Sequence, residues 1–328
     1  MIEKVFDALS SNISKEYRKY IADTFESGSE SLDQLYCSYT SLDAFYPRPI
    51  LTYLGTKYDA NHLSDFDTHA FPTVIFIPQI VRDFLAIHDD VIDEDLIKFN
   101  TDTFPFAISK QYNPHVEYMT KKGKDLAIVF ADYSIPIIYN IASHTERDEK
   151  VRLALVNAIS RVLLKTCTGQ IMELELEQRM PFSIDENEIL MLYDRKAADY
   201  CYAFPFELGM IYAGAPSELI DDSRKILLQI GACSQVVNDI EGIFYESYGD
   251  ERDTVSDLLA LRRTYLLVKL SHMTASDMVK GLLEKDSLTD GEAQTIKDEM
   301  IACNLLGSVC SDIYKICSDI SARIKTLN

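Results

Sequence analysis

The chain has 328 residues, of which 47% are hydrophobic, and its formal net charge is −20 at pH 7. This length and hydrophobic fraction suffice for a large core. The negative charge excludes a general nucleic-acid binder, which needs a basic face. An anionic substrate would therefore need metal ions or a local cluster of Lys and Arg in order to bind.

No apolar run reaches the length of a membrane span, and the first residues, Met1–Lys4, show no basic-then-apolar signal pattern. The 7 cysteines show neither a CxxC motif nor Cys/His metal spacing. We therefore expect a soluble, cytoplasmic protein with no membrane span and with free cysteines.

Taken in chain order, the sequence predicts helices separated by polar or proline-containing breaks. The expected helices cover residues 2–25, 31–46, 50–58, 72–95, 116–142, 147–178, 185–213 and 217–247, with three more within 252–327. Pro47-Arg48-Pro49 is expected to be a break, 59–71 a polar loop, and 99–114 a mixed segment suited to a flap. Alternating β-branched runs joined by turns are missing, so the predicted fold class is all-α.

The most informative stretch is Leu85–Asp95, at the end of the helix expected over 72–95. Residues four apart lie on one face of a helix, so Asp89 and Asp93 point the same way, with Asp90 beside them. Carboxylates this close repel each other unless a cation lies between them, and Mg²⁺ takes oxygen ligands of this kind. A solvated acidic helix end is the ordinary explanation of an acidic run, and on this motif alone it would be preferred.

A second oxygen-rich helix face lies within Gln235–Glu246. Asn238, Gly242 and Glu246 follow one another at four-residue steps, with Asp239 next to the first of them. Two such faces from distant parts of the chain could meet across a helical bundle and hold metal between them. The predicted metal-site residues are Asp89, Asp90, Asp93, Asn238, Asp239, Gly242 and Glu246.

The two motifs resemble the metal-binding motifs of class I isoprenoid enzymes, the polyprenyl synthetase and terpene synthase superfamily, and the first is a full DDxxD. Other landmarks follow in the family's order, so the resemblance covers nearly the whole chain. They are Ala131-Asp132-Tyr133, Gly169-Gln170, Lys196-Ala197-Ala198, Asp257-Leu258 and Arg262-Arg263-Thr264. The resemblance implies one isoprenoid synthase-like domain over 1–328, a helical bundle around a central cavity, and Mg²⁺, three ions, as cofactor. A homodimer follows from family analogy alone.

The resemblance also implies a substrate, an allylic prenyl diphosphate of C10 to C20. Lys196, Arg262 and Arg195 would hold its diphosphate. Phe84 and Phe99 offer aromatic faces to an allylic cation, although such residues are more often simple core packing. The remaining predicted substrate-binding residues are Lys98, Gln235, Arg82 and Arg48.

The chain departs from the family at the site for isopentenyl diphosphate, where chain-elongating members use four cationic positions. Three of the four are uncharged here, because Phe45-Tyr46 precedes Arg48 and Phe99 follows the first motif; the fourth holds Arg82. A diphosphate carries about three negative charges, and taking it into a partly dry site without cations would cost several kcal/mol. The isopentenyl diphosphate site therefore looks dismantled, whereas the groups expected to bind the allylic diphosphate are retained.

Three kinds of function remain. The leading hypothesis is Mg²⁺-dependent ionisation of an allylic prenyl diphosphate, as a terpene synthase or cyclase, or as a prenyltransferase to an acceptor other than isopentenyl diphosphate. Asn238 and Glu246 match the terpene synthase form of the second motif, with Gly242 in place of its hydroxyl residue. The alternative is a trans-prenyl diphosphate synthase that condenses isopentenyl diphosphate with the allylic substrate. A non-catalytic subunit is the third, and the full DDxxD argues against it.

Overall fold

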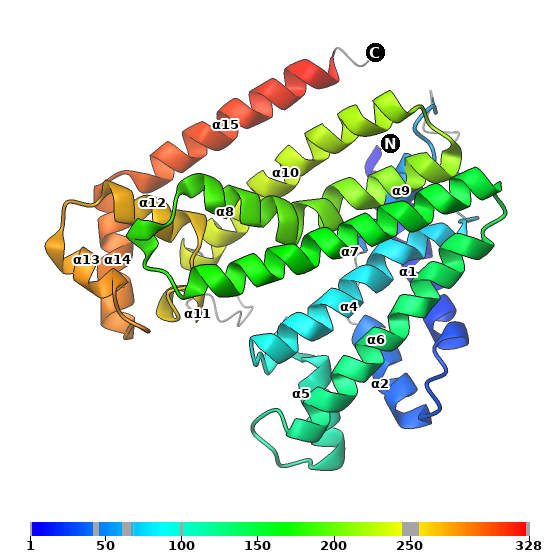
Figure 1. Ribbon diagram of the computed structural model, residues 1–328, viewed down its shortest axis with the longest axis horizontal. Coiled ribbons are helices and arrows are strands. Elements are labelled where there is room, and N and C mark those ends of the chain that lie inside the picture. The colour runs from blue at the N-terminus through cyan, green and yellow to red at the C-terminus, as the bar shows by residue number, and fades with distance from the viewer. Residues whose placement is uncertain are drawn as a thin grey trace. The chain divides into compact units, whose positions relative to one another are not determined.

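The computed structural model describes residues 2–41, 46–60, 67, 69–98, 101–244 and 256–325. Within them the chain is helical almost throughout, which confirms the all-α class (Figure 1). Its internal contacts divide it into two compact units. Unit 1 is Met1–Leu163 with Tyr200–Arg224, and unit 2 is Leu164–Asp199 with Lys225–Asn328. The single domain expected from the resemblance stays a prediction.

Unit 1 holds the N-terminal helices, a short hairpin, and parts of three elements that continue into unit 2. Its complete elements are α1 (Ile2–Thr24), α2 (Glu30–Ser41), α3 (Pro47–Gly55), η2 (Thr73–Phe76), α4 (Ile77–Ile92), β1 (Ile97–Lys98), β2 (Thr101–Asp102), α5 (Phe104–Tyr112), α6 (Lys121–His144) and α9 (Phe204–Ala213). The shared elements are α7 (Glu149–Glu177), the π-helix η4 (Asp194–Ala203) and α10 (Ser217–Phe244).

The remaining helices belong to unit 2. They are η3 (Pro181–Ser183), α8 (Glu186–Tyr193), α11 (Ser256–Leu259), α12 (Tyr265–Met273), α13 (Asp277–Leu283), α14 (Asp290–Ala302) and α15 (Leu305–Ile324). Helix α12 is buried on all sides, from Tyr265 to Ser271, so it is the central helix of this core. The Thr264 hydroxyl caps its N-terminus by accepting the Leu267 N–H at 3.4 Å.

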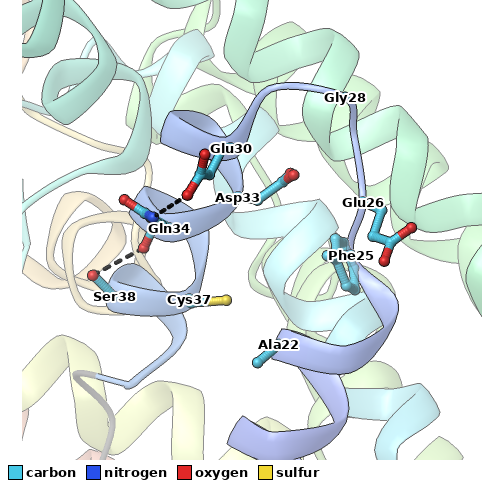
Figure 2. A pocket seen from close by; sticks show the side chains of 9 residues that line it. All are labelled: Ala22, Phe25, Glu26, Gly28, Glu30, Asp33, Gln34, Cys37 and Ser38. Carbon is cyan, nitrogen blue, oxygen red and sulfur yellow. Dashed lines mark hydrogen bonds between the residues drawn. The ribbon is translucent and has the colours of Figure 1, made fainter.

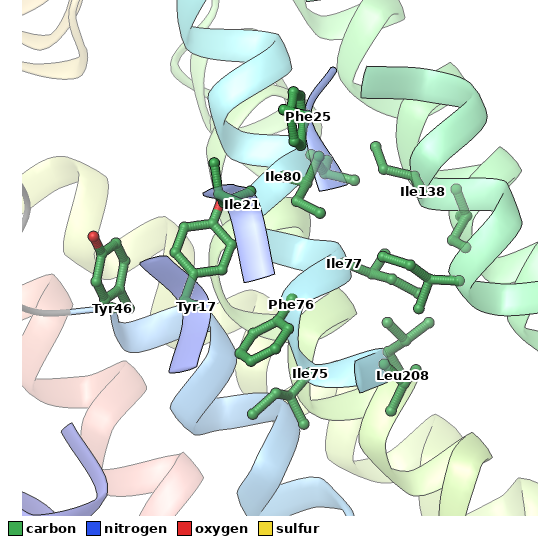
Figure 3. Packing of buried hydrophobic residues seen from close by; sticks show 14 of the residues in the cluster. Tyr17, Ile21, Phe25, Tyr46, Ile75, Phe76, Ile77, Ile80, Ile138 and Leu208 are labelled. Carbon is green, nitrogen blue, oxygen red and sulfur yellow. The ribbon is translucent and has the colours of Figure 1, made fainter. Parts of the chain in front are cut away.

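The core of unit 1 forms around α4, which carries the first acidic motif at its end. Ile77 and Ile80 are fully buried on α4, and the Phe76 ring just before it packs 5.5 Å from the Tyr17 ring of α1 (Figure 3). Helix α4 also packs along α6. Because its apolar residues recur on successive turns, α4 is held on its buried side and delivers its polar end to a fixed place.

Helices α3 and α9 approach each other unusually closely in unit 1, and each contributes a glycine to the contact. A Cβ on Gly55 would lie 2.2 Å from the Phe206 carbonyl oxygen, and one on Gly209 would lie 2.0 Å from that of Thr52. Neither position can carry a larger side chain without moving a backbone. The contact fixes α3, and with it Arg48 in the first turn of that helix.

The structure corrects several predicted boundaries. Helix α3 begins at Pro47 rather than at residue 50, because proline fits the first helical turn, where its missing N–H has no helical partner. The mixed segment 99–114 contains α5 and the strand β2, which pairs with β1 in a hairpin whose strands are two residues long. The expected absence of strands was therefore wrong for β1 and β2.

The helix predicted over 185–213 is interrupted by η4. Pro205 lies in the first turn of α9 and has no N–H to donate to the preceding turn, and the chain widens into a π-helix before it. Among the described C-terminal residues, breaks occur near Thr274 and before Asp290 as predicted. A further break at Asn304, with φ of 55°, separates α14 from α15.

One described helix, α6, is long and apolar enough to cross a membrane by length and composition alone, and 44% of its apolar window is buried inside unit 1. The α14–α15 pair passes the same test only if it is taken as one span bent by 60°. Buried apolar helices of this kind are typical of a core helix, so neither is a clear membrane span. The described cysteines are all free, as expected.

Candidate active-site residues in the two units

The acidic end of α4 gathers its carboxylates around one lysine. The Lys98 ammonium lies 3.3 Å from Asp89 Oδ2, 2.7 Å from Asp90 Oδ1 and 3.0 Å from Asp95 Oδ2. Lys98 lies on β1, which pairs antiparallel with β2 so that Lys98 is opposite Thr101. Asp93 is the C-cap of α4, and its N–H donates to the Asp89 carbonyl at 2.8 Å. The three predicted aspartates therefore occupy one helix end, as the spacing indicated.

This arrangement fits a hard cation. Asp90 is only 1% exposed, and burial raises the pKa of its carboxyl group to about 6, against the lowering effect of Lys98. Burial disfavours the charged form of Lys98, but the surrounding carboxylates outweigh it and raise the pKa of the ammonium. Among the described residues no group of three acidic, His or Cys side chains already has metal-binding geometry. The donor set is nevertheless the kind that Mg²⁺ takes, and a single positive charge already lies among its oxygens.

Arg82 is neutralised by its own neighbour. The Asp83 carboxylate is 1% exposed and accepts hydrogen bonds from Arg82 Nη1 at 3.2 Å, from Gln79 Nε2 at 3.1 Å and from the Tyr17 hydroxyl at 2.7 Å. The Tyr36 hydroxyl lies 3.5 Å from the same carboxylate. Sequence reasoning missed this network, because its members come from three different helices, α1, α2 and α4.

Arg48 lies in the same unit. Its Nη2 donates to the Cys201 sulfur at 3.0 Å, and its guanidinium lies 5.2 Å from the centre of the Tyr200 ring. Its Nε atom is buried without a hydrogen-bond partner in the described part of the chain. Both partners come from η4, so Arg48 contacts aromatic and sulfur groups where the family resemblance expected a diphosphate.

The predicted aromatic residues are only partly placed. Phe84 is half-buried on α4, and its ring packs 4.6 Å from that of His88. Phe45 and Phe99, which replace expected cations, lie outside the described residues.

In unit 2, Lys196 lies on η4 beside α7. Its ammonium forms an ion pair with Glu173, whose carboxylate also accepts from Gln170 Nε2 at 3.1 Å. A Cβ on Gly169 would lie 2.8 Å from the Lys196 backbone nitrogen, so the glycine of the Gly-Gln step permits the close approach of α7 to η4. Arg195 is half-buried on the same turn.

The second motif lies on α10. Asn238 is exposed and Gly242 half-buried on one face, whereas Asp239 is 7% exposed and faces inward. The Asp239 carboxylate accepts from the Tyr193 hydroxyl, and its Oδ2 lies 3.3 Å from the Tyr265 N–H. Gln235 Nε2 lies 3.5 Å from Asp239 Oδ1. Asp239 thus joins α10 to the start of α12, a structural contact that the sequence did not reveal.

Two other predicted site residues of unit 2 are Glu246 and Arg262. Glu246 lies outside the described residues. Arg262 is half-buried in the turn before α12, while the next residue, Arg263, donates from Nε to the Arg179 carbonyl at 2.7 Å and from Nη2 to the Glu177 carbonyl at 3.3 Å. Arg263 therefore satisfies carbonyl groups at the C-terminal end of α7. Arg262 stays the arginine of this pair that the sequence predicts to bind substrate.

A surface pocket of about 740 Å³ lies between α1 and α2. Figure 2 shows its lining side chains, among them Phe25, Glu26, Asp33 and Cys37. None of the predicted site residues lines it. It is therefore not the candidate active site.

Comparison with known proteins agrees with the motifs. A geranylgeranyl diphosphate synthase of Sulfolobus acidocaldarius is 23% identical over 208 residues, which cover 63% of this chain and 58% of the relative. A (2E,6E)-farnesyl diphosphate synthase of Mycobacterium bovis is 23% identical over 218 residues, covering 66% of this chain and 54% of the relative. The chain thus spans little more than half the length of these relatives.

Solved structures match over more of the chain. The geranylgeranyl pyrophosphate synthase of Corynebacterium glutamicum, complexed with isoprenyl diphosphate and magnesium, has a TM-score of 0.77 at 17% identity, covering 98% of this chain and 92% of its own. A polyprenyl synthetase of Streptomyces coelicolor has a TM-score of 0.79 at 15% identity, covering 100% and 95%. These structures confirm the fold. Since the polyprenyl synthetase family model matches residues 46–300, most of the chain, this protein belongs to the polyprenyl synthetase family.

Proposed function

We propose that the protein is a Mg²⁺-dependent prenyl-transfer enzyme that ionises an allylic prenyl diphosphate. The observation that carries the proposal is the group of carboxylates at the end of α4, which converges on one positive charge at 2.7 to 3.3 Å. A cluster of this kind, in a family that handles prenyl diphosphates, is suited to holding the counter-ions of a leaving diphosphate.

The first candidate reaction is condensation with isopentenyl diphosphate, as a trans-prenyl diphosphate synthase. The family membership and the names of the relatives, geranylgeranyl and farnesyl diphosphate synthases, favour it over the terpene synthase hypothesis. The lost cationic positions are the feature of the chain that favours the terpene synthase hypothesis instead.

A second candidate is ionisation without isopentenyl diphosphate, which yields a terpene or a prenylated acceptor. The specific observation in its favour is the state of the two remaining cations. Arg82 is already paired with the buried Asp83, and Arg48 contacts Cys201 and Tyr200. An incoming diphosphate would find the charge of Arg82 already compensated by Asp83, so that of the two cations only Arg48 would meet it without a carboxylate partner among the described contacts.

Both reactions begin with the same step. Mg²⁺, when bound, would neutralise the charge that builds on the leaving diphosphate. Asp89 and Asp93, with Asp90 and on α10 Asn238, Gly242, Glu246 and Asp239, are the proposed residues to hold it. Lys98 would leave its carboxylates, and Lys196 would leave Glu173, to donate to diphosphate oxygens. Arg195, Arg262 and Gln235 would complete the diphosphate contacts.

One assay separates the candidates. Purified protein and Mg²⁺ are incubated with geranyl, farnesyl or geranylgeranyl diphosphate, with and without isopentenyl diphosphate, and the products are separated by chromatography and mass spectrometry. Longer diphosphates that form only with isopentenyl diphosphate establish condensation. Hydrocarbons or alcohols that form without it establish the second candidate. An Asp89→Ala variant should lose either activity while its circular dichroism stays unchanged, and full turnover by that variant would remove the α4 motif from the mechanism.

We also propose that the enzyme acts as a homodimer, on the basis of the outer face of α7. Leu164 is 71% exposed and Ile171 is 60% exposed, and with Cys167 and Leu174 they alternate at three- and four-residue steps. This spacing is that of a seam between two helices, and a two-fold axis would place the same seam against itself. Ile171→Glu should lower the molar mass measured by light scattering, whereas Met278→Glu, at a 64% exposed position of α13, should not. A cytoplasmic location and the absence of nucleic-acid binding stay predictions.

A further inference from the structure

One face of α7 contacts η4 at three successive turns within unit 2. Lys165, Gly169 and Glu173 follow at four-residue steps and so lie on one line along the helix. Gly169 permits the close backbone contact, and Glu173 pairs with the Lys196 ammonium. Lys165, the first of the three, has no role in the reaction proposed above.

Lys165 bridges two residues of the π-helix. Its ammonium lies 2.8 Å from Asp194 Oδ2 and 2.9 Å from Asp199 Oδ2. In an α-helix, residues five apart would be separated by about 140° around the axis and would not both reach one ammonium easily. In a π-helix the backbone bond runs from residue i to residue i+5, so the same two residues stack one turn apart. The geometry of the bridge therefore matches the π-helical form of this segment better than an α-helical one.

The bridge is also partly removed from water. The Asp199 side chain is 0% exposed and that of Lys165 is 22% exposed, so this is not a surface ion pair of little consequence. On the opposite side, a Cβ on Gly231 of α10 would lie 2.6 Å from the Cα and Cβ of Ala198. The turn is enclosed by α7 and α10, and Lys196 lies between the two bridged aspartates in the chain.

We propose that Lys165 is a positioning residue: by clipping Asp194 to Asp199 it holds η4 as a π-helix and so sets where Lys196 presents its ammonium to the substrate diphosphate. This inference rests on the proposed function through the role of Lys196. A return to the α-helical form would turn Lys196 relative to Glu173 and to the rest of unit 2. Displacements of about 1 Å in groups that position a substrate can cost about 100-fold in rate.

Three variants test the clip, each with hydrogen–deuterium exchange and with binding of inorganic pyrophosphate in the presence of Mg²⁺. Asp194→Asn breaks the bridge but leaves the buried Asp199 paired with Lys165. Lys165→Met removes the bridge and takes the ammonium away from the buried Asp199 carboxylate. The double variant Lys165→Met/Asp199→Asn removes the bridge together with the buried negative charge of Asp199. It therefore separates loss of the bridge from misfolding caused by a buried carboxylate that has lost its ammonium. Lys121→Met, which breaks the exposed Lys121–Asp125 pair of α6, is the matched control.

All three variants should exchange the amides of 196–203 about tenfold faster than the wild type, with amides of α8 unchanged. The dissociation constant for pyrophosphate should rise about tenfold, the loss expected for one charge-assisted contact. In turnover assays KM for the allylic diphosphate should rise with it, and Lys121→Met should match the wild type.

Wild-type exchange and affinity in the double variant would overturn the proposal, because Lys165 would then serve only to compensate the charge of Asp199. Failure of the wild type itself to bind pyrophosphate would overturn the proposed function and the role of Lys196. The exchange data would still decide whether Lys165 fixes the π-helical turn, so the two failures are distinguishable.

Discussion

Replacing Gly169 by alanine tests how tightly α7 is packed on η4. The added Cβ would lie 2.8 Å from the Lys196 nitrogen and 3.0 Å from the Arg195 carbonyl carbon, whereas ordinary contacts begin at 3.4 Å. Both are backbone atoms, so the two helices must separate by several tenths of an ångström. Overpacking of this kind costs about 1–3 kcal/mol, offset by up to about 1 kcal/mol from the better helix propensity of alanine. Because backbone atoms cannot move aside cheaply, the upper part of that cost applies, about 2–3 kcal/mol, and we expect a net loss of about 1–2 kcal/mol in the free energy of unfolding.

Urea unfolding followed by circular dichroism measures this loss. Gly281→Ala in α13 is the matched control, because a Cβ there would meet nothing within 4 Å. That variant should be more stable than the wild type by up to about 1 kcal/mol. Glycine to alanine should therefore lower the free energy of unfolding at position 169 and raise it at position 281. If Gly169→Ala were as stable as the wild type while Gly281→Ala behaved as expected, the close contact between α7 and η4 would not exist.

Three other predictions address single interactions. Tyr193→Phe should lower the free energy of unfolding in urea by about 1–3 kcal/mol, because the Tyr193 hydroxyl donates to the buried Asp239 carboxylate and accepts the Tyr265 N–H at 2.8 Å; an unchanged midpoint would contradict this. Lys98→Met should lower the thermal midpoint more without Mg²⁺ than with it, as fluorimetry would show, because the buried Asp90 loses its cation; equal shifts would refute the counter-ion role. Hydrogen bonds from Lys285 and Thr289 lower the pKa of the Glu292 carboxyl group from 4.5 to about 2. The ionised carboxylate therefore stabilises the fold at neutral pH, and this stabilisation is lost as the pH falls from 4.5 toward 2. Glu292→Gln should accordingly be less stable than the wild type at pH 7, with the difference shrinking in acid.

The spacing of residues within one helix predicted which candidate site residues lie next to one another on that helix. Asp89 and Asp93 share the end of α4, and Asn238 and Gly242 share a face of α10, because side-chain direction within a helix follows from its period. The all-α class was also predictable, since periodic apolar residues and few breaks leave little else.

Contacts between distant residues were not predictable in this way. The Asp83 carboxylate accepts hydrogen bonds from the hydroxyl groups of Tyr17 and Tyr36, which lie 66 and 47 positions away in the chain. No local pattern marks either tyrosine as its partner. Likewise, Lys165 pairs with Asp199 across 34 positions, and no local pattern predicts that contact or the π-helical form of η4. Arg82 is predicted to bind substrate from its place in the sequence, and its ion pair with the next residue, Asp83, was not foreseen.

The lysine at the end of α4 has a consequence for the order of events. Lys98 compensates part of the negative charge of Asp89, Asp90 and Asp95, because one ammonium lies within ion-pair distance of all three carboxylates. If the protein acts as proposed, a divalent ion bound to these oxygens would displace the Lys98 ammonium, and the substrate diphosphate would offer that ammonium a new anion. Metal binding and substrate binding would then be coupled, because each would favour the other.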